Sequence, residues 1–543
     1  MKRLILCFLI SFSFLNASSI TKIPDKNIKD ELQRKIYNEQ NKDKVIEENK
    51  TYDMKLIEVN ENSKEDDCIE IEKISIKNST IFDEDDFEEL IKPYLNNCNG
   101  MKNLSNLRDK ISNMYIDKGY VTSRAYFKPQ DLSDAEIEIH ILEGKIEKIE
   151  DENIKSSNLY FSYEDRILNL KDLEVVVQQA QRLKSQKADI KLIPGTKVGY
   201  TIVKIVGEEV SKPYLGNLGI NNYGTKKTGK YQLYASADYE NLFDINDIVN
   251  LNINTTDNII KNNNNTLGTS VSYSFPIYRA LFNFDYTYSN YKQLNKDEFN
   301  DNFQSDGNNH SFGIGVSYKL FHTKRDTLEL FSDFENKKSN NFLNETKLEL
   351  QSYNLNVLNI GIKHTYLADS YDYYSKWTIS KGLNGTENFA RQETDFLKYI
   401  LDLGFNKYFE TQNNLKFTSL LRAQYSKNYL FGTEEISMGG VYSVRGFNDT
   451  GLSGNTGMYL RNELAPTYTF DKVNISPYFA VDYGYVEENE NNIYGTIVGG
   501  TIGSRVVWKD INFDIFYSIP LKDSEFTKDE SSSFVGLNMI YFY

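Results

Sequence analysis

The stretch FVGLNMIYFY (residues 534–543) alternates large apolar side chains with small or polar ones. As a β-strand, it would place Gly536 and Asn538 on one face. The opposite face would carry only apolar side chains, namely Val535, Leu537, Met539, Tyr541 and Tyr543. A charge on a lipid-facing position near mid-membrane costs roughly 2–4 kcal/mol, and this face has none. The stretch therefore predicts a transmembrane strand with one face in lipid.

The same period-two alternation runs from Pro213 to Tyr543, where helical periodicity disappears. We count about sixteen strands in this region, which predicts an all-β transmembrane barrel. Long polar connections are expected at 262–265, 293–309, 336–347, 381–392, 428–456, 487–492 and 522–532, and short turns at 242–247, 276–280, 321–326, 368–372, 410–414, 471–473 and 509–510. Long loops on one rim and tight turns on the other are typical of outer-membrane barrels. The alternative, a soluble all-β sandwich, has no reason to alternate its connections in this way.

Composition agrees with a membrane barrel and argues against other classes. Mean hydropathy is -0.54, yet 13% of the residues are aromatic, with 39 Tyr and 32 Phe. So many aromatic residues argue against a disordered chain. A helical membrane protein would show apolar runs of about 20 residues, and the chain has only one shorter run, near its start. The net charge of -15 makes nucleic acid an unfavourable partner.

Residues 1–19 have the features of a secretory signal peptide. Lys2 and Arg3 precede an apolar run over Leu4–Leu15, and small residues follow from Ala17. The run is too short to span a membrane as a helix. We therefore expect the chain to be exported.

Two polar segments follow. Residues 20–50 are expected to form an N-terminal plug helix, because the highly charged part over 25–50 has too few apolar residues for a core face. Such a helix needs a polar place to sit, and a barrel lumen offers one. Residues 51–67 are acidic and weakly patterned, which indicates a linker.

Two tandem α+β units are expected between the linker and the barrel, over 68–144 and 145–212. In the first, a strand over 69–76 is followed by a helix capped by Asp83, a second helix ending at Gly119, and strands over 121–127 and 135–142. The second repeats the β-α-α-β-β order, with strands over 145–150, 188–194 and 199–206 and helices over 163–168 and 170–183. The repetition predicts a duplicated docking module.

Two cysteines, Cys68 and Cys98, remain after removal of the leader, which contains Cys7. An even pair in an exported protein favours a disulfide. It would close a loop of about 31 residues and stabilise the fold by roughly 3 kcal/mol. A pair of buried thiols is the alternative.

One long loop contains the sequence GGVYSVRGF, residues 439–447. Its arginine, Arg445, lies between small residues and could enter a wet lumen, where a guanidinium needs a carboxylate. Downstream, alternation points Asp482 and Gly484 into the lumen, so an Arg445–Asp482 pair is geometrically reasonable. The preceding strand similarly points Tyr459, Arg461 and Glu463 inward, although Arg461 and Glu463 could instead pair with each other on the wall.

At this point the chain resembles a known family. Val444-Arg445-Gly446-Phe447 is similar to the VRGF/Y motif of the loop that enters the barrel in two-partner secretion transporters (the TpsB family, of the hemolysin secretion/activation ShlB/FhaC/HecB type). Asp482 and Gly484 match the lumenal strand motif that pairs with this arginine. Further matches are Cys68 and Cys98, the GYVTSRAY stretch with Gly119, Tyr120, Arg124 and Tyr126, and the PQDL stretch over 129–132.

The resemblance implies two POTRA domains followed by a sixteen-stranded outer-membrane barrel, with the POTRA domains in the periplasm. It implies a translocation pore for a large unfolded exoprotein of the hemolysin or adhesin type, whose N-terminal secretion domain the POTRA domains recognise. Outer-membrane lipid and the barrel assembly machinery are the other expected partners. Tyr120 and Tyr126 are expected to be core and strand residues rather than partner contacts.

Other functions are less well supported by the residues. The main alternative is an assembly factor that inserts other barrels, but such proteins usually carry three or more docking domains. A barrel lipase would need a nucleophile and a base, and we find no G-x-S-x-G, H-E-x-x-H or phosphate-loop motif. The histidines are scattered without ligand spacing, at His140, His310, His322 and His364. We therefore expect no enzymatic activity, cofactor or metal.

Overall fold

The computed structural model describes residues 54–59, 68–160, 163–225, 228–256, 264–296, 302–323, 325–384, 392–411, 414–488, 493–528 and 532–543. The predicted signal peptide, the plug helix over 20–50 and most of the linker over 51–67 lie outside the described residues. Among the helices that the structure describes, none is long and apolar enough to cross a membrane.

The first α+β unit packs two helices against a three-stranded sheet in the order β2-β5-β4. Asp83 is the N-cap of the first helix, as predicted, and forms a capping box with Asp86; Gly119, at φ +100°, follows the end of the second helix. The core joins both helices to the sheet through Phe87, Leu107, Ile111, Tyr115, Ile139 and Ile141. The elements are β1 (Ile69–Ile71), β2 (Lys73–Lys77), α2 (Glu84–Ile91), η1 (Lys92–Tyr94), β3 (Asn97–Asn99), α3 (Met101–Asp117), β4 (Arg124–Phe127) and β5 (Glu136–Leu142).

The second α+β unit has a three-stranded sheet in the order β6-β8-β7, covered by one helix. Its elements are β6 (Lys145–Glu152), α4 (Leu170–Ala180), β7 (Gln186–Pro194) and β8 (Tyr200–Glu209). The helix expected over 163–168 is wrong. Asp165 has a positive φ of 62°, and Ile167 forms an isolated bridge with Lys145, so this short segment turns back onto the sheet edge instead of winding.

The chain from Tyr214 onward forms a closed antiparallel barrel of 16 spanning strands, as predicted. The last strand closes the barrel against the first, with Asn538 opposite Asn221. Two short elements, β16 (Thr346–Lys347) and β24 (Tyr468–Phe470), extend this sheet at a loop and beyond Pro466. The spanning strands are β9 (Tyr214–Asn221), β10 (Gln232–Glu240), β11 (Ile248–Thr256), β12 (Asn265–Ile277), β13 (Ala280–Lys296), β14 (Asn302–His322), β15 (Asp326–Leu343), β17 (Tyr353–Leu367), β18 (Tyr371–Leu383), β19 (Leu397–Phe409), β20 (Leu415–Ser426), β23 (Thr456–Ala465), β25 (Val473–Glu488), β26 (Ile493–Trp508), β27 (Ile511–Lys522) and β28 (Phe534–Phe542).

Two of the predicted long loops are wrong. Residues 293–296 and 302–309 continue the β13–β14 ladder, and residues 336–343 continue the β14–β15 ladder, with Lys296 opposite Asn302 and Leu343 opposite Ser305. These strand ends are polar on both faces, because a strand that has left the lipid no longer needs an apolar outer face. Polarity alone therefore does not distinguish a protruding strand from a loop.

The outer face of the barrel is apolar, as the alternation predicted. In β28, Val535, Leu537 and Met539 are exposed while Gly536 is buried inside. In β25, Phe479 and Val481 are exposed on the outside, whereas Ala480 between them and Asp482 and Gly484 beyond them are buried. One face of each strand thus lies in lipid and the other lines the lumen.

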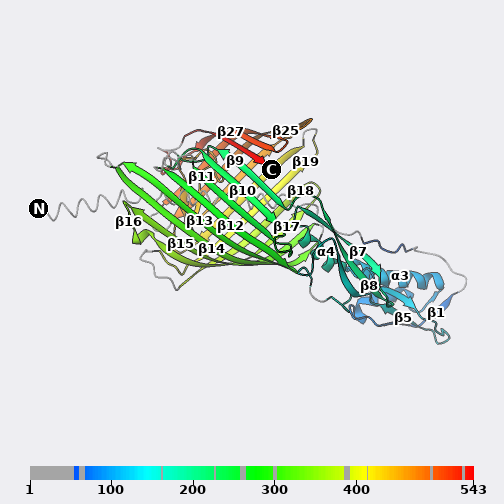
Figure 1. Ribbon diagram of the computed structural model, residues 1–543. Coiled ribbons are helices and arrows are strands. Elements are labelled where there is room, and N and C mark those ends of the chain that lie inside the picture. Colours follow the sequence, from blue (N-terminus) through cyan, green and yellow to red (C-terminus); the bar gives the residue numbers. More distant parts are fainter. Residues whose placement is uncertain are drawn as a thin grey trace.

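The second α+β unit is docked on the short turns of the barrel, and the first unit lies farther out (Figure 1). Arg182 donates to the Asn246 carbonyl at 2.9 Å and to Ser274 Oγ at 2.6 Å. Glu240 accepts a hydrogen bond from the Ser185 N–H at 2.8 Å. Burial lowers the pKa of Arg182 to about 10, so it stays charged near neutral pH. These polar contacts hold the second unit at the rim of the barrel that carries the short turns.

Candidate functional site: a loop held against the barrel wall

The loop between β20 and β23 folds back into the barrel. A short hairpin inside it pairs β21 (Ile436–Met438) with β22 (Leu452–Gly454) and carries the VRGF stretch at its tip. The apolar side of this hairpin and tip packs on the inner wall of β23, β25 and β26 in one cluster, formed by Ile436, Met438, Val444, Phe447, Leu452, Tyr459, Val486 and Ile497. Apolar packing therefore holds the loop against the inner wall of the barrel.

Arg445 and Asp482 form a fork-shaped ion pair at the tip. Arg445 Nε donates to Asp482 Oδ2 at 2.6 Å, and Nη2 donates to Asp482 Oδ1 at 2.7 Å. The Arg445 backbone N–H adds a third bond to Asp482 Oδ2 at 3.1 Å. Arg445 is only 3% exposed and Asp482 is fully buried. Bidentate pairing in a buried site fixes the orientation of the guanidinium as well as its position.

The ion pair extends into a charged network along the wall. Arg445 Nη1 donates to Glu463 Oε2 at 3.0 Å, and Glu463 also accepts two bonds from Arg505, at 2.6 and 2.9 Å. The network continues to Asp514, whose carboxylate lies 3.6 Å from Arg505 and accepts from Tyr478 at 3.1 Å. The Arg505 guanidinium also lies over the Tyr478 ring. Three carboxylates, on β23, β25 and β27, thus share two arginines, one from the loop and one from β26.

Glycines permit the close approach of loop and wall. Gly446 has φ +98°, which favours glycine, and a Cβ there would lie 2.6 Å from the Ile519 carbonyl oxygen. A Cβ on Gly484 would meet Met438 Sδ at 2.5 Å and Val444 at 2.9 Å. A Cβ on Gly499 would overlap the Arg445 carbonyl oxygen. The loop backbone can reach Asp482 only because the wall lacks side chains at these points.

Tyr459 and Arg461 also lie on the lumenal face, at 2% and 6% exposure. Arg461 donates to the Val441 carbonyl at 2.8 Å, so it contacts the loop backbone. The alternative in which Glu463 pairs with Arg461 is not what the structure shows: Glu463 bonds to Arg445 and Arg505. Tyr459 packs in the apolar cluster beneath the tip.

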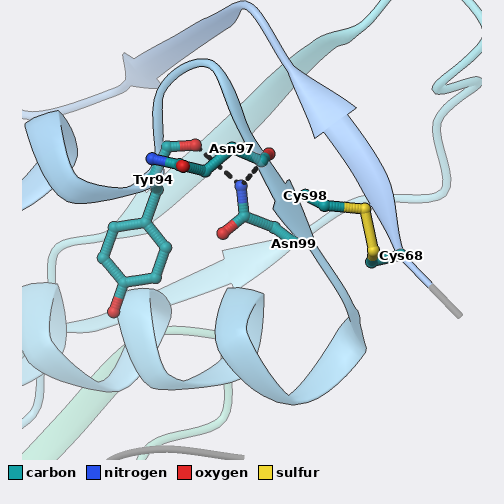
Figure 2. Close-up of a disulfide and its surroundings, with 5 residues drawn as sticks. All are labelled: Cys68, Tyr94, Asn97, Cys98 and Asn99. Carbon is teal, nitrogen blue, oxygen red and sulfur yellow. Dashed lines mark hydrogen bonds between the residues drawn. A yellow bond between two sulfur atoms is a disulfide. The ribbon is translucent and has the colours of Figure 1, made fainter. Parts of the chain in front are cut away.

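The predicted disulfide between Cys68 and Cys98 is present, with 5.3 Å between the two Cα atoms (Figure 2). The disulfide joins the start of β1 to β3. These two strands pair antiparallel, and Glu70 lies opposite Cys98. Beside it, the Asn99 side chain donates to the carbonyls of Tyr94 and Asn97 at 2.7 and 2.8 Å (Figure 2). These contacts fix the backbone just before α3 begins.

In the GYVTSRAY stretch, Tyr120, Arg124 and Tyr126 contact other residues of the first α+β unit. Tyr120 packs beside the buried Tyr115, and Tyr126 lies in β4 against the His140 ring. Arg124 donates to the Val121 and Ser123 carbonyls, and partial burial lowers its pKa. In the PQDL stretch, Gln130 exchanges two hydrogen bonds with the Glu138 backbone.

Comparison with known proteins identifies the family to which the barrel region belongs. The profile described as haemolysin secretion/activation protein ShlB/FhaC/HecB matches residues 199–506. The chain belongs to this family. A ShlB-type POTRA domain profile matches residues 69–144 of the chain, and a second POTRA domain profile matches residues 139–194.

Curated relatives and a solved structure agree. The chain is similar to the outer membrane transporter CdiB of Dickeya dadantii, at 28% identity over 464 residues and 82% of each chain. It is 27% identical to the hemolysin transporter protein HpmB of Proteus mirabilis, over 78% of this chain and 77% of that one. Its fold is similar to that of CdiB from Escherichia coli, with a TM-score of 0.85 at 23% identity, covering 96% of this chain and 98% of the other.

The chain is therefore an outer-membrane transporter of the two-partner secretion type, with its POTRA domains in the periplasm. The relatives are named as transporters, not as enzymes.

Sequence reasoning missed part of the site of this transporter. Arg505 and Asp514 lie on β26 and β27, and only the barrel places them beside Glu463. Glu434, at the root of the loop, was also missed, although it is fully buried between two lysines. A charged residue at an inward position of an alternating strand is the signal that could have identified Arg505 and Asp514.

Proposed function

We propose that the transporter exports one large client of the hemolysin or adhesin type, unfolded, through the lumen beside the VRGF loop. The proposal rests on one observation above all: Arg445, 3% exposed, is held by three hydrogen bonds to Asp482 and one to Glu463 inside the barrel. A gated protein conduit needs such an element to seal the pore at rest and to position the client's path. The two POTRA domains argue against a general porin, which has no need of periplasmic docking domains.

Client capture is proposed to occur at the POTRA sheets. Their strand orders leave β2 and β4 of the first domain, and β6 and β7 of the second, as edges within their sheets. An extended segment can add to such an edge through backbone hydrogen bonds, with modest side-chain specificity. Two such domains in series would combine two weak contacts and raise the local client concentration at the pore.

The polar segment over 25–50 is proposed to help close the pore at rest. Energy for export would come from client folding outside the cell, since the residues supply no nucleotide-binding motif. Outer-membrane lipid and the barrel assembly machinery are proposed as the other partners, because a closed barrel with an apolar outer face must be inserted into a bilayer.

Deletion of the transporter gene tests this proposal. The expected result is that one large protein disappears from the culture medium while the other outer-membrane proteins keep their levels, and that re-expression restores it. Loss of many outer-membrane proteins would instead support an assembly factor. A normal set of secreted proteins would contradict the proposal.

A further inference from the structure

The root of the VRGF loop has its own buried ionic contact, away from Arg445. Glu434 Oε1 lies 2.9 Å from Lys337 Nζ on β15, and Glu434 Oε2 lies 2.7 Å from Lys398 Nζ on β19. The Glu434 side chain is fully buried, and that of Lys398 is 8% exposed. One carboxylate therefore bridges two strands of the wall. Its removal would leave the buried Lys398 ammonium without its carboxylate, whereas Lys337 would keep its contact with Glu335 Oε2 at 2.7 Å.

The backbone at the root is fixed as well. Lys398 Nζ and Gln424 Nε2 both donate to the Glu434 carbonyl, at 3.2 and 2.9 Å. Gln424 also donates to the carbonyl of Asn455, where the loop returns to the barrel, at 3.2 Å. Asn455 Oδ1 in turn accepts from the Leu430 N–H at 3.1 Å. These bonds tie the outgoing and returning ends of the loop together.

Apolar packing strengthens the same point. Leu430 and Phe431 are 0% and 1% exposed and pack with β17 and the start of β19 in a cluster completed by Tyr353, Leu355, Val357 and Phe396. This cluster shares no residue with the apolar cluster under the tip. We call Leu430, Phe431, Glu434 and Asn455, with their wall partners, the base clamp, and the Arg445 contacts to Asp482 and Glu463 the tip latch.

We propose that the base clamp is a second, independent positioning site, which keeps the root of the loop on the wall when the tip latch opens. The two sites use different strands and no common partner, so their energies should be nearly additive. Between them, Gly439 and Gly440 have φ +114° and +103°, and Gly451 lies against Gly439. These glycines separate a movable tip over 441–450 from a fixed root.

The inference deepens the proposed role of the loop, but its test needs no client, so the two can fail separately. Single cysteines are placed at the base (Leu430→Cys) or at the tip (Val444→Cys, 0% exposed) in the full-length transporter, whose Cys68 and Cys98 are bonded to each other. Maleimide labelling rates are measured in liposomes. Arg445→Ala should speed labelling of the tip cysteine at least tenfold and leave the base cysteine unchanged. Glu434→Gln should speed labelling of the base cysteine at least tenfold.

Wall variants keep the test valid if a loop variant folds poorly. Lys337→Met should act like Glu434→Gln, whereas Lys338→Met, at the next and exposed position of the strand, should leave both rates unchanged. Heat-modifiable gel mobility verifies a folded barrel in every variant. Equal acceleration of both cysteines by Arg445→Ala would mean that the loop moves as one body and would overturn the inference. An unchanged base rate in Glu434→Gln and Lys337→Met would do the same.

Discussion

Replacement of Arg445 by alanine is the most direct perturbation of the lumenal loop. It removes the two side-chain bonds to Asp482 and the bond to Glu463. The backbone bond to Asp482 and the Arg505–Glu463 bonds remain. Removing one partner of a buried ion pair costs about 3–5 kcal/mol, because a buried charge is left without its counterpart.

That free energy acts on the equilibrium between the seated and the released loop. Since about 1.4 kcal/mol corresponds to a factor of ten, about 3–5 kcal/mol shifts this equilibrium by roughly two to three and a half powers of ten. Asp482→Ala removes the same fork from the wall and should have an effect of similar size. Arg445→Lys keeps the charge but not the bidentate geometry, so we expect an intermediate effect.

Two assays measure the outcome. In planar bilayers, the open fraction of single channels should rise by at least a hundredfold in Arg445→Ala. In cells, client secretion should fall strongly while the barrel still inserts, as judged by outer-membrane fractionation and heat-modifiable mobility. Normal secretion together with an unchanged open fraction in both Arg445→Ala and Asp482→Ala would refute the reasoning.

Three further outcomes are expected. Gly499→Ala should displace the tip of the loop and lower client secretion, because its Cβ would overlap the Arg445 carbonyl oxygen. Gly313→Ala, whose Cβ would lie 3.7 Å from its nearest neighbour, should leave secretion unchanged. Equal secretion by the two variants would contradict this steric account. Cys68→Ser should destabilise the first POTRA domain by roughly 3 kcal/mol and speed its proteolysis in the full chain, while the barrel stays resistant, and an unchanged digestion rate would show that the staple is not needed. Deletion of residues 25–50 should raise conductance in planar bilayers, and equal conductance would remove the plug hypothesis but leave the transporter.

The sequence by itself determined the local periodicities and therefore the class of fold. Period-two alternation without charges on the outer face, as over 534–543, is required wherever a strand lies in lipid, so the barrel could be predicted from single strands. Asp83 and Gly119 marked helix ends through backbone preferences that act within a few residues. Where polarity was the only signal, as over 293–309, a protruding strand and a loop had the same composition, and the prediction failed.

Only the tertiary structure decided which charges meet. Inward alternation placed Asp482 and Glu463 on the lumenal face, but only the register between the consecutive strands β23, β25, β26 and β27 made Arg505 and Asp514 their neighbours. Glu434 lies in an irregular loop with no periodicity to read, and its lysines come from β15 and β19. Contacts between distant segments depend on chain closure and on the path of the loop through the lumen, which no local pattern encodes.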